Sequence, residues 1–195
     1  MIKPKFKNKE YVLLLIGPSG SGKGTQADFL KKRIPRLKII RTGPMLKKLA
    51  RRNTITAEFV LPYLKNGLLV PGWLASFTWM KVVFESVLSG ENLLFDGAPR
   101  QVSEARLLDE VMNWHKKPLP RAIFLDIDRK ESQRRLLLRG RSDDTNEAIK
   151  ERLKFYYKNV IPVISYFKKN KRLIRVNGEQ EPEKVAEDIR KALHI

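Results

Sequence analysis

The chain has 195 residues, 42% of them hydrophobic, which suits one domain with a buried core and excludes a wholly disordered protein. Cysteine is absent, which excludes disulfides, thiolate zinc sites and cysteine nucleophiles, and the apolar runs are too short for a signal peptide or a bilayer-spanning helix. With 40 Lys and Arg residues against 21 Asp and Glu residues, the formal net charge is +19, which attracts polyanions and phosphorylated molecules. We therefore expect a cytoplasmic protein that does not bind membranes.

Short apolar runs predict five strands, of which the first, residues 11–16, leads into glycine-rich sequence. The other four are expected at 37–41, 92–96, 122–127 and 172–176. Helical periodicity starts at residue 23 and stops at Pro35, and further helices are expected at 43–52, 56–67, 72–90, 103–115, 129–139, 145–169 and 181–193. The helix at 145–169 should bend near Pro162, because proline has no backbone N–H to donate.

Strands and helices alternate along the whole chain, which predicts an α/β fold. Right-handed crossovers place the helices on both faces of a central five-stranded parallel sheet. Ligands of such sheets bind beyond the carboxyl ends of the strands. The residues that follow or end the predicted strands are Gly17, Thr42, Asp96, Asp126 and Asp128. We therefore expect a single site at this edge of the sheet.

The stretch GPSGSGKGT, residues 17–25, matches a phosphate-binding loop in all but one position. Its first three glycines let backbone N–H groups converge on anionic oxygens, and the following helix adds the positive end of its dipole. Lys23 supplies a full charge to the terminal phosphates. A Ser or Thr normally follows the lysine and binds magnesium, but Gly24 stands there. Another group must therefore orient the metal.

Extended to GPSGSGKGTQA, this loop resembles that of the adenylate kinase family of nucleoside monophosphate kinases, in which G-K-G-T-Q is usual. The resemblance covers nearly the whole chain. RTGPMLK (41–47) stands where the family has S-T-G-D-[LM]-L-R, GLLVPG (67–72) where it has G-x-L-V-P-[DE], and DGAPRQVSEA (96–105) where it has D-G-F-P-R-x-x-x-Q-A. RLLLRGRSDD (135–144), followed by Arg152, matches the arginines of a short lid, and VNGEQEPEKV (176–185) resembles the closing strand and turn beside the donor base.

The resemblance implies a P-loop NTPase fold, a three-layer sandwich in which residues 1–195 form a single kinase domain. Its core is expected at 11–41, 90–139 and 146–195, with an NMP-binding helical segment at 42–72 and a short lid at 139–145 that lacks a metal-binding insert. No zinc is therefore expected. Mg²⁺ enters with ATP, held mainly by nucleotide phosphates and water, and Asp96 orients metal-bound water. The implied reaction moves the γ-phosphate of ATP to AMP or a related monophosphate.

The resemblance also implies residue roles. The ATP site is expected to comprise Gly20, Ser21, Gly22, Lys23, Gly24, Thr25, Arg135, Arg139 and Gly178, with Arg135 over the donor adenine. The acceptor site is expected to comprise Thr42, Lys47, Val70, Gly97, Arg100, Glu104, Arg141 and Arg152. The catalytic residues are expected to be Lys23, Arg100, Arg139, Arg141 and Arg152, with Asp143 and Asp144 holding the lid. Cations are needed because phosphoryl transfer aligns two anionic nucleotides, and guanidinium forks match phosphate oxygens.

Several acceptor positions depart from the family pattern. Pro44 and Gly72 replace acidic residues, Lys47 replaces Arg, and Ala98 replaces Phe. Glu104 stands where the family has the Gln that reads adenine. Ionised Glu only accepts hydrogen bonds, which suits the adjacent donors of guanine better than the mixed edge of adenine. GMP, CMP or UMP is therefore an alternative acceptor, whereas AMP stays the acceptor if Glu104 faces solvent or remains protonated.

Two functions of other kinds stay open. The net charge and the altered acceptor motifs also suit a basic nucleic-acid-associated ATP-binding protein on the same fold. The lid arginines favour the kinase, since they are hard to explain without phosphoryl transfer. A deoxynucleotide or small metabolite could also be the phosphoryl acceptor. Non-specific polyanion binding is compatible with either function, and no heptad repeat indicates an oligomer, so we expect a monomer.

Overall fold

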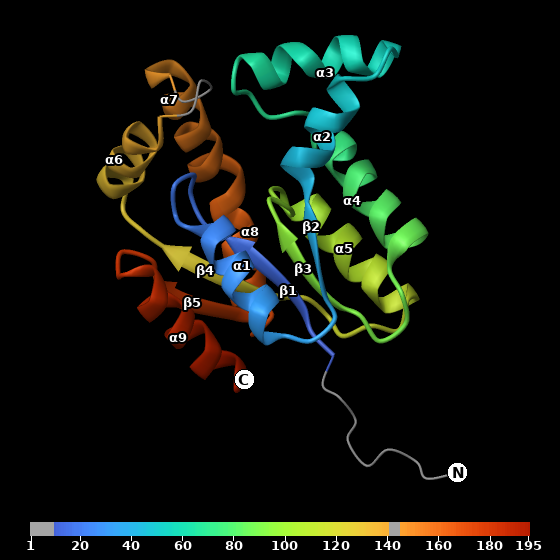
Figure 1. Cartoon of the computed structure of the whole chain (residues 1–195), viewed down its shortest axis with the longest axis vertical. Helices are drawn as coiled ribbons and strands as arrows, with labels where there is room; N and C mark the ends of the chain where they lie inside the picture. Colours follow the sequence, from blue (N-terminus) through green and yellow to red (C-terminus); the bar gives the residue numbers. More distant parts are fainter. Residues whose placement is uncertain (1–9, 141–144) are drawn as a thin grey trace.

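The five predicted strands form one parallel sheet. In the computed structural model of the chain, which describes residues 10–140 and 145–195, the strand order is β2-β3-β1-β4-β5 (Figure 1). The strands are β1 (Val12–Ile16), β2 (Leu37–Arg41), β3 (Asn92–Asp96), β4 (Arg121–Asp126) and β5 (Leu173–Asn177). The α/β fold with a central five-stranded parallel sheet is therefore confirmed.

The predicted helices are present with small shifts at their ends. They are α1 (Lys23–Arg33), α2 (Thr42–Ala50), α3 (Ile55–Lys65), α4 (Gly72–Ser86), α5 (Val102–Trp114), α6 (Arg129–Arg139), α7 (Asn146–Phe155), α8 (Ile161–Lys169) and α9 (Pro182–Leu193). Among the residues that the structure describes, no helix combines the length and the hydropathy that a membrane crossing requires.

Alternate residues of the strands face two separate cores, which makes the molecule a three-layer sandwich. Leu13 and Leu15 of β1 pack with α1 and α9 on one face of the sheet. Val12, Leu14 and Ile16 pack with α4, α5 and α8 on the other face. All five residues of β1 are buried, as expected for the central strand of a parallel sheet that is covered on both sides.

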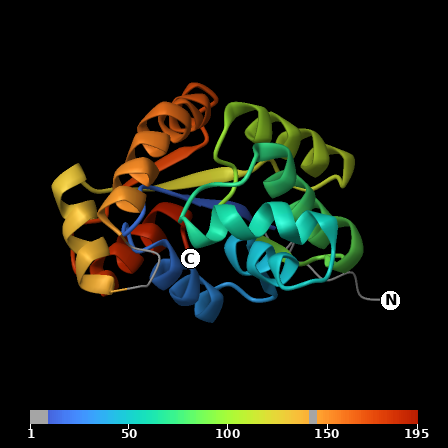
Figure 2. The ribbon, with the colours of Figure 1, turned by 90° about the horizontal axis from the view of Figure 1, so that it is seen from above.

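Two small helical groups stand beyond the sheet and flank the carboxyl ends of its strands (Figures 1 and 2). In the first group, α2 and α3 pack with α4 through the cluster Leu46, Val60 and Leu74. In the second, α6 packs against α7 through the cluster Leu136, Ile149 and Leu153. Each group has its own small apolar core, and residues from both line the cavity described below.

The predicted helix at 145–169 is interrupted, as expected, but the irregularity precedes Pro162. A five-residue π-helical segment, η1 (Tyr156–Val160), joins α7 to α8. Pro162 lies in the first turn of α8, directly after η1, and the backbone at Val160 and Ile161 before it stays helical. Tyr156 and Val160 of the π turn are buried in the core on the face of the sheet that α8 covers, and both also line the cavity described below.

Candidate active site

The phosphate loop connects the end of β1 to the start of α1. Gly20 and Gly22 have φ angles of 83° and 86°, in the left-handed region that favours glycine. A Cβ at Gly20 would lie 3.1 Å from the carbonyl oxygen of Ser132. The Ser132 hydroxyl in turn donates a hydrogen bond of 2.7 Å to the carbonyl of Ser19. The glycine thus allows α6 to pack directly on the loop and hold its shape.

The Lys23 side chain folds back over the loop that precedes it. Its Nζ donates to the carbonyl oxygens of Gly17 (2.8 Å) and Pro18 (2.7 Å). Burial lowers the pKa of Lys23 to about 8; the Asp96 carboxylate opposes this shift, and the charge of Arg100 adds to it. The ammonium group is therefore held in place, poorly solvated and surrounded by more positive than negative charge, as a phosphate site requires.

This shift predicts that ATP affinity depends on pH. Bound phosphates stabilise protonated Lys23, so ATP binds the protonated form, and the fraction of that form falls as pH rises above about 8. We expect the Kd for ATP to rise by up to about tenfold per pH unit above 8 and to stay flat between pH 6 and 7. Isothermal titration in buffers of different ionisation enthalpy measures the coupled proton uptake at pH 8.5. A Lys23→Met variant with the same pH dependence would contradict the assignment.

On the acceptor side, the structure brings Thr42, Gly97 and Arg100 together. The Thr42 hydroxyl donates to the carbonyl of Gly97 (3.3 Å), and the Arg100 Nε donates to the same carbonyl (2.8 Å). A Cβ at Gly97 would lie 2.9 Å from the Thr42 Oγ1, and the φ of Gly97 is 96°, so only glycine fits there. Burial lowers the pKa of Arg100, while the carboxylates of Glu104 and Asp96 oppose the shift.

Glu104 does not face solvent, so the alternative in which it does is wrong. Its side chain is 3% exposed, and its Oε2 accepts hydrogen bonds from the backbone N–H groups of Arg100 and Gln101 at the start of α5. The carboxylate thus caps its own helix. Burial raises the pKa of Glu104, and its hydrogen bonds and Arg100 oppose this shift. The neighbouring Gly72 leaves room for the side chain of Gln101, whose Oε1 would lie 2.5 Å from a Cβ at position 72.

The lid arginines that the structure describes approach the site from α6 and α7. Arg139 is the exposed last residue of α6 and lines the cavity. Arg152 of α7 donates a hydrogen bond of 3.1 Å to the carbonyl of Gly67, in the predicted NMP-binding segment. The two sides of the cleft thus touch. The predicted sites at Arg141, Asp143 and Asp144 lie outside the described residues.

The two residues assigned to the donor base contact each other. Arg135 donates from its NH1 to the carbonyl of Gly178 (2.9 Å) and from its Nε to Glu131 (2.5 Å). Hydrogen bonds from Arg134 and Arg135 lower the pKa of Glu131 to about 2. The guanidinium plane of Arg135 is thus fixed between α6 and the turn after β5, although the two residues are 43 positions apart in the chain.

A cavity of about 510 Å³ joins the phosphate loop to the acceptor side. Seven of the predicted residues line it, namely Lys23, Lys47, Val70, Gly97, Arg100, Arg139 and Arg152. The other described ones, Gly20, Ser21, Gly22, Gly24, Thr25, Thr42, Asp96, Glu104, Arg135 and Gly178, are not among its lining residues. Sequence reasoning missed the lining residues Tyr156 and Val160, although they follow Arg152 at intervals of four and so share its helix face.

Asp96, the predicted metal-site residue, ends β3 with its side chain 17% exposed. Within residues 10–140 and 145–195, no three His, Cys, Asp or Glu side chains are grouped closely enough to hold a metal ion by themselves. One carboxylate beside a phosphate loop nevertheless fits Mg²⁺, which is commonly held by one or two carboxylates, nucleotide phosphates and water. The donor set thus fits an ion that enters with its nucleotide.

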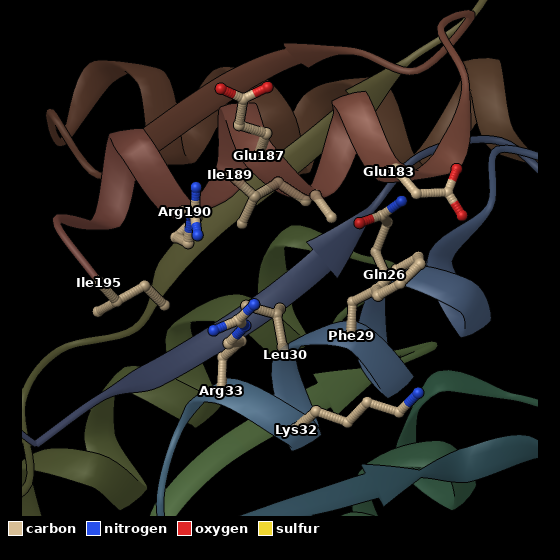
Figure 3. A pocket seen from close by; sticks show the side chains of 11 residues that line it. Gln26, Phe29, Leu30, Lys32, Arg33, Glu183, Glu187, Ile189, Arg190 and Ile195 are labelled. Atoms are coloured by element: carbon tan, nitrogen blue, oxygen red, sulfur yellow. The ribbon is translucent and has the colours of Figure 1, made fainter.

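A second cavity, of about 450 Å³, lies between α1 and α9 (Figure 3). Phe29, Leu30 and Ile189 form apolar parts of its wall, and it shares no lining residue with the first cavity. At one end, the Gln26 Nε2 donates to the carbonyl of Pro182 (2.9 Å), which ties α1 to the start of α9. None of the predicted site residues lines this cavity.

A phosphate loop at the head of a parallel sheet, facing arginines across one cavity, defines a P-loop nucleotide kinase. The family model described as "Adenylate kinase" matches residues 15–172. Three curated adenylate kinases are similar to the chain: those of Prochlorococcus marinus strain MIT 9301 and of Thermus thermophilus are each 33% identical, and adenylate kinase 1 of Nostoc sp. PCC 7120 is 32% identical. Each alignment covers 93–94% of this chain and 97% of the relative. The chain therefore belongs to the adenylate kinase family of phosphotransferases.

Proposed function

We propose that this protein transfers the γ-phosphoryl group of ATP, with Mg²⁺, to AMP and yields two ADP. The observation that carries the proposal is the shared cavity, in which Lys23 of the phosphate loop and Arg100 and Arg152 of the acceptor side line one space. Two anionic substrates that enter from opposite sides would meet there with their charge neutralised. The relatives named adenylate kinase support the same reaction.

In this mechanism the acceptor phosphate supplies its own nucleophile. One of its oxygens is already anionic, so no general base is needed; it bonds to the γ-phosphorus as the bond to the β–γ bridging oxygen breaks, and ADP leaves. Lys23 stabilises the transferred group from the loop side. Arg100 holds the acceptor phosphate, and Arg139 and Arg152 neutralise the equatorial oxygens, because fixed cations that match the developing charge lower the barrier.

Asp96 is the residue that would orient the metal hydration shell. When bound, Mg²⁺ neutralises the β- and γ-phosphate oxygens of ATP. Asp96 would hold the hydrated ion beside the loop, in place of the hydroxyl that Gly24 lacks. Thr25 and the N–H groups of residues 20–24 bind the phosphates, and Arg135 with Gly178 binds the donor base.

The segment 42–72 and the lid at 139–145 are proposed to close over the two nucleotides and exclude water. Lys47 and Val70 belong to the first segment and would accompany the acceptor. The hydrogen bond between Arg152 and the Gly67 carbonyl shows that the two sides can be in contact across the cavity. Arg152 would then transfer its donors to phosphate oxygens once an acceptor is bound.

The acceptor is tested directly by a coupled assay of ADP release with ATP·Mg²⁺ and each of AMP, GMP, CMP, UMP and dTMP. We expect AMP to give the highest kcat/KM, by at least about tenfold over GMP. Highest turnover with another monophosphate would make that nucleotide the substrate. No turnover with any acceptor, despite ATP binding, would favour the nucleic-acid-associated ATP-binding protein.

Glu104 has a separate test, because its carboxylate is engaged by the backbone of α5 and does not line the cavity. We expect Glu104→Gln to leave the ratio of AMP to GMP kcat/KM within about threefold of wild type, since the amide can take the same cap. Glu104→Ala removes the cap and lowers the free energy of unfolding by about 1 kcal/mol. A GMP preference in wild type that reverses in Glu104→Gln would show that Glu104 reads the base after all.

We also propose that the protein is a cytoplasmic monomer and that its net charge of +19 gives non-specific binding to polyanions. Light scattering coupled to size-exclusion chromatography measures the mass in solution. Heparin retention should fall steeply as salt rises through the physiological range, because such binding releases counterions. Retention that persists well above physiological salt would point to a specific nucleic-acid function.

A further inference from the structure

Arg41 is a cation beside the metal-site carboxylate that the phosphate chemistry described above does not use. It ends β2 and pairs in register with Asp96, which ends β3. Its Nε lies 3.5 Å from the Asp96 Oδ2, and its NH2 donates to the Oδ1 of Asp28 on α1 at 2.6 Å. The guanidinium thus links α1 and β3 across the end of the sheet.

Asp28, which accepts the hydrogen bond from Arg41, lies on the same side of α1 as Gly24, the position where the phosphate-loop motif normally has a metal-binding hydroxyl. Gly24 and Asp28 are four residues apart, so they share one face of the helix. A Cβ at Gly24 would meet nothing within 4 Å, so packing does not require a glycine there. In the aligned family motif, Ser stands at the position of Arg41 and Asp at that of Pro44. Relative to that motif, this chain has gained a base beside Asp96 and has lost an acid three residues further along the chain.

Asp96 is shared among three cations. It opposes the burial that lowers the pKa of Lys23 and of Arg100, and it adds to the raised pKa of Arg41, for which the hydrogen bond to Asp28 is the largest cause. Neither Arg41 nor Asp96 is among the residues that line the active-site cavity, so Arg41 acts on the metal site through its contact with this carboxylate. A carboxylate that already faces three positive charges attracts a further cation less than a solvated one does.

We propose that Arg41 is a positioning residue of the metal site: its guanidinium holds the Asp96 carboxylate and competes with hydrated Mg²⁺ for it. Mg²⁺ therefore strengthens ATP binding less in this chain than it would with the serine of the family motif. The inference rests on the proposed ATP site and concerns its metal requirement. ATP can then bind through Lys23 and the loop while the Asp96 carboxylate is partly withdrawn from the metal.

The test measures the Kd for ATP by titration calorimetry, once with Mg²⁺ and once with EDTA, and takes the ratio of the two values. We expect Arg41→Ser to increase the Mg²⁺ enhancement of binding by about threefold to tenfold. Asp28→Asn, which removes the other carboxylate that binds Arg41, should act in the opposite direction and lower the Mg²⁺ enhancement, because Arg41 then has only Asp96 to neutralise it. Arg33→Ser makes the same charge change at the second cavity and should leave the ratio unchanged.

A double-mutant cycle separates this role from a structural one. In an Asp96→Asn background, Arg41→Ser should no longer change the Mg²⁺ enhancement, because the shared carboxylate is gone. An Arg41→Ser ratio within twofold of wild type, or a shift matched by Arg33→Ser, would overturn the proposal. The binding measurement needs no phosphoryl acceptor. Its result can therefore be interpreted even if no acceptor gives turnover in the coupled assay. Lack of ATP binding by the wild type, with or without metal, would overturn both this inference and the proposed function.

Discussion

Replacing Lys23 with alanine should lower kcat/KM for the ATP-dependent reaction by about 10³-fold or more, which is about 4 kcal/mol of transition-state stabilisation. Lys23 is the loop cation that lines the shared cavity, and its burial keeps the ammonium poorly hydrated until phosphates replace the Gly17 and Pro18 carbonyls. Its charge therefore acts at short range on the transferred group. Steady-state kinetics with saturating AMP measures the loss.

Two controls separate catalysis from folding. Lys32 lies on the same helix but is exposed and lines only the second cavity, so Lys32→Ala should keep wild-type kinetics. The melting temperature of Lys23→Ala should not fall, because the substitution removes a buried charge. Activity of Lys23→Ala within tenfold of wild type would contradict a role for Lys23 in the transition state.

Arg100→Ala should cost about as much, roughly 10³-fold in kcat/KM for the acceptor, because it removes a desolvated guanidinium that lines the cavity. Arg100→Lys should still lose about 10²-fold. It keeps the charge but cannot hold the Gly97 carbonyl and a phosphate with one planar fork. Initial-rate kinetics with varied AMP should place much of the loss in the KM for the acceptor, while the Kd for ATP changes little.

The matched control for Arg100 is Arg106→Ala, an exposed arginine on the following helix α5. Its kinetics should equal those of wild type. If Arg100→Ala weakened ATP binding and acceptor binding equally, Arg100 would belong to the donor side or to the general electrostatics of the cleft. Because Arg100 also balances Glu104, the unfolding free energy of each variant is measured alongside its kinetics.

The departures on the acceptor side have different physical consequences. Gly72 leaves the space that the Gln101 side chain enters, so an acidic residue there would meet both Gln101 and Glu104. Glu104 is engaged in capping α5 and offsets the charge of Arg100. The loss of acids at positions 44 and 72 therefore leaves a cavity rich in cations. Such a cavity suits phosphates, and Asp96, at the end of β3, is the carboxylate that we propose to orient the metal.

The sequence by itself determined the phosphate loop and the order of strands and helices. Both are local features: glycines at 17, 20 and 22 and the lysine that follows act within nine residues, and each strand is one short apolar run. The alternation then fixes a parallel sheet with its site at the carboxyl ends, because crossovers have one hand. The central sheet, its two covering layers and the family could therefore be predicted before any coordinates.

The tertiary structure decided how the site residues act on one another. Arg41 meets Asp96 only because two strands 55 residues apart pair in register, and Arg135 meets Gly178 because α6 packs beside the turn after β5. The lowered pKa of Lys23 sums the burial and charges of groups from several elements. Residue type and spacing cannot supply these quantities, since they depend on distances between elements. For the same reason, the capping role of Glu104 was not evident until the start of α5 was fixed in space.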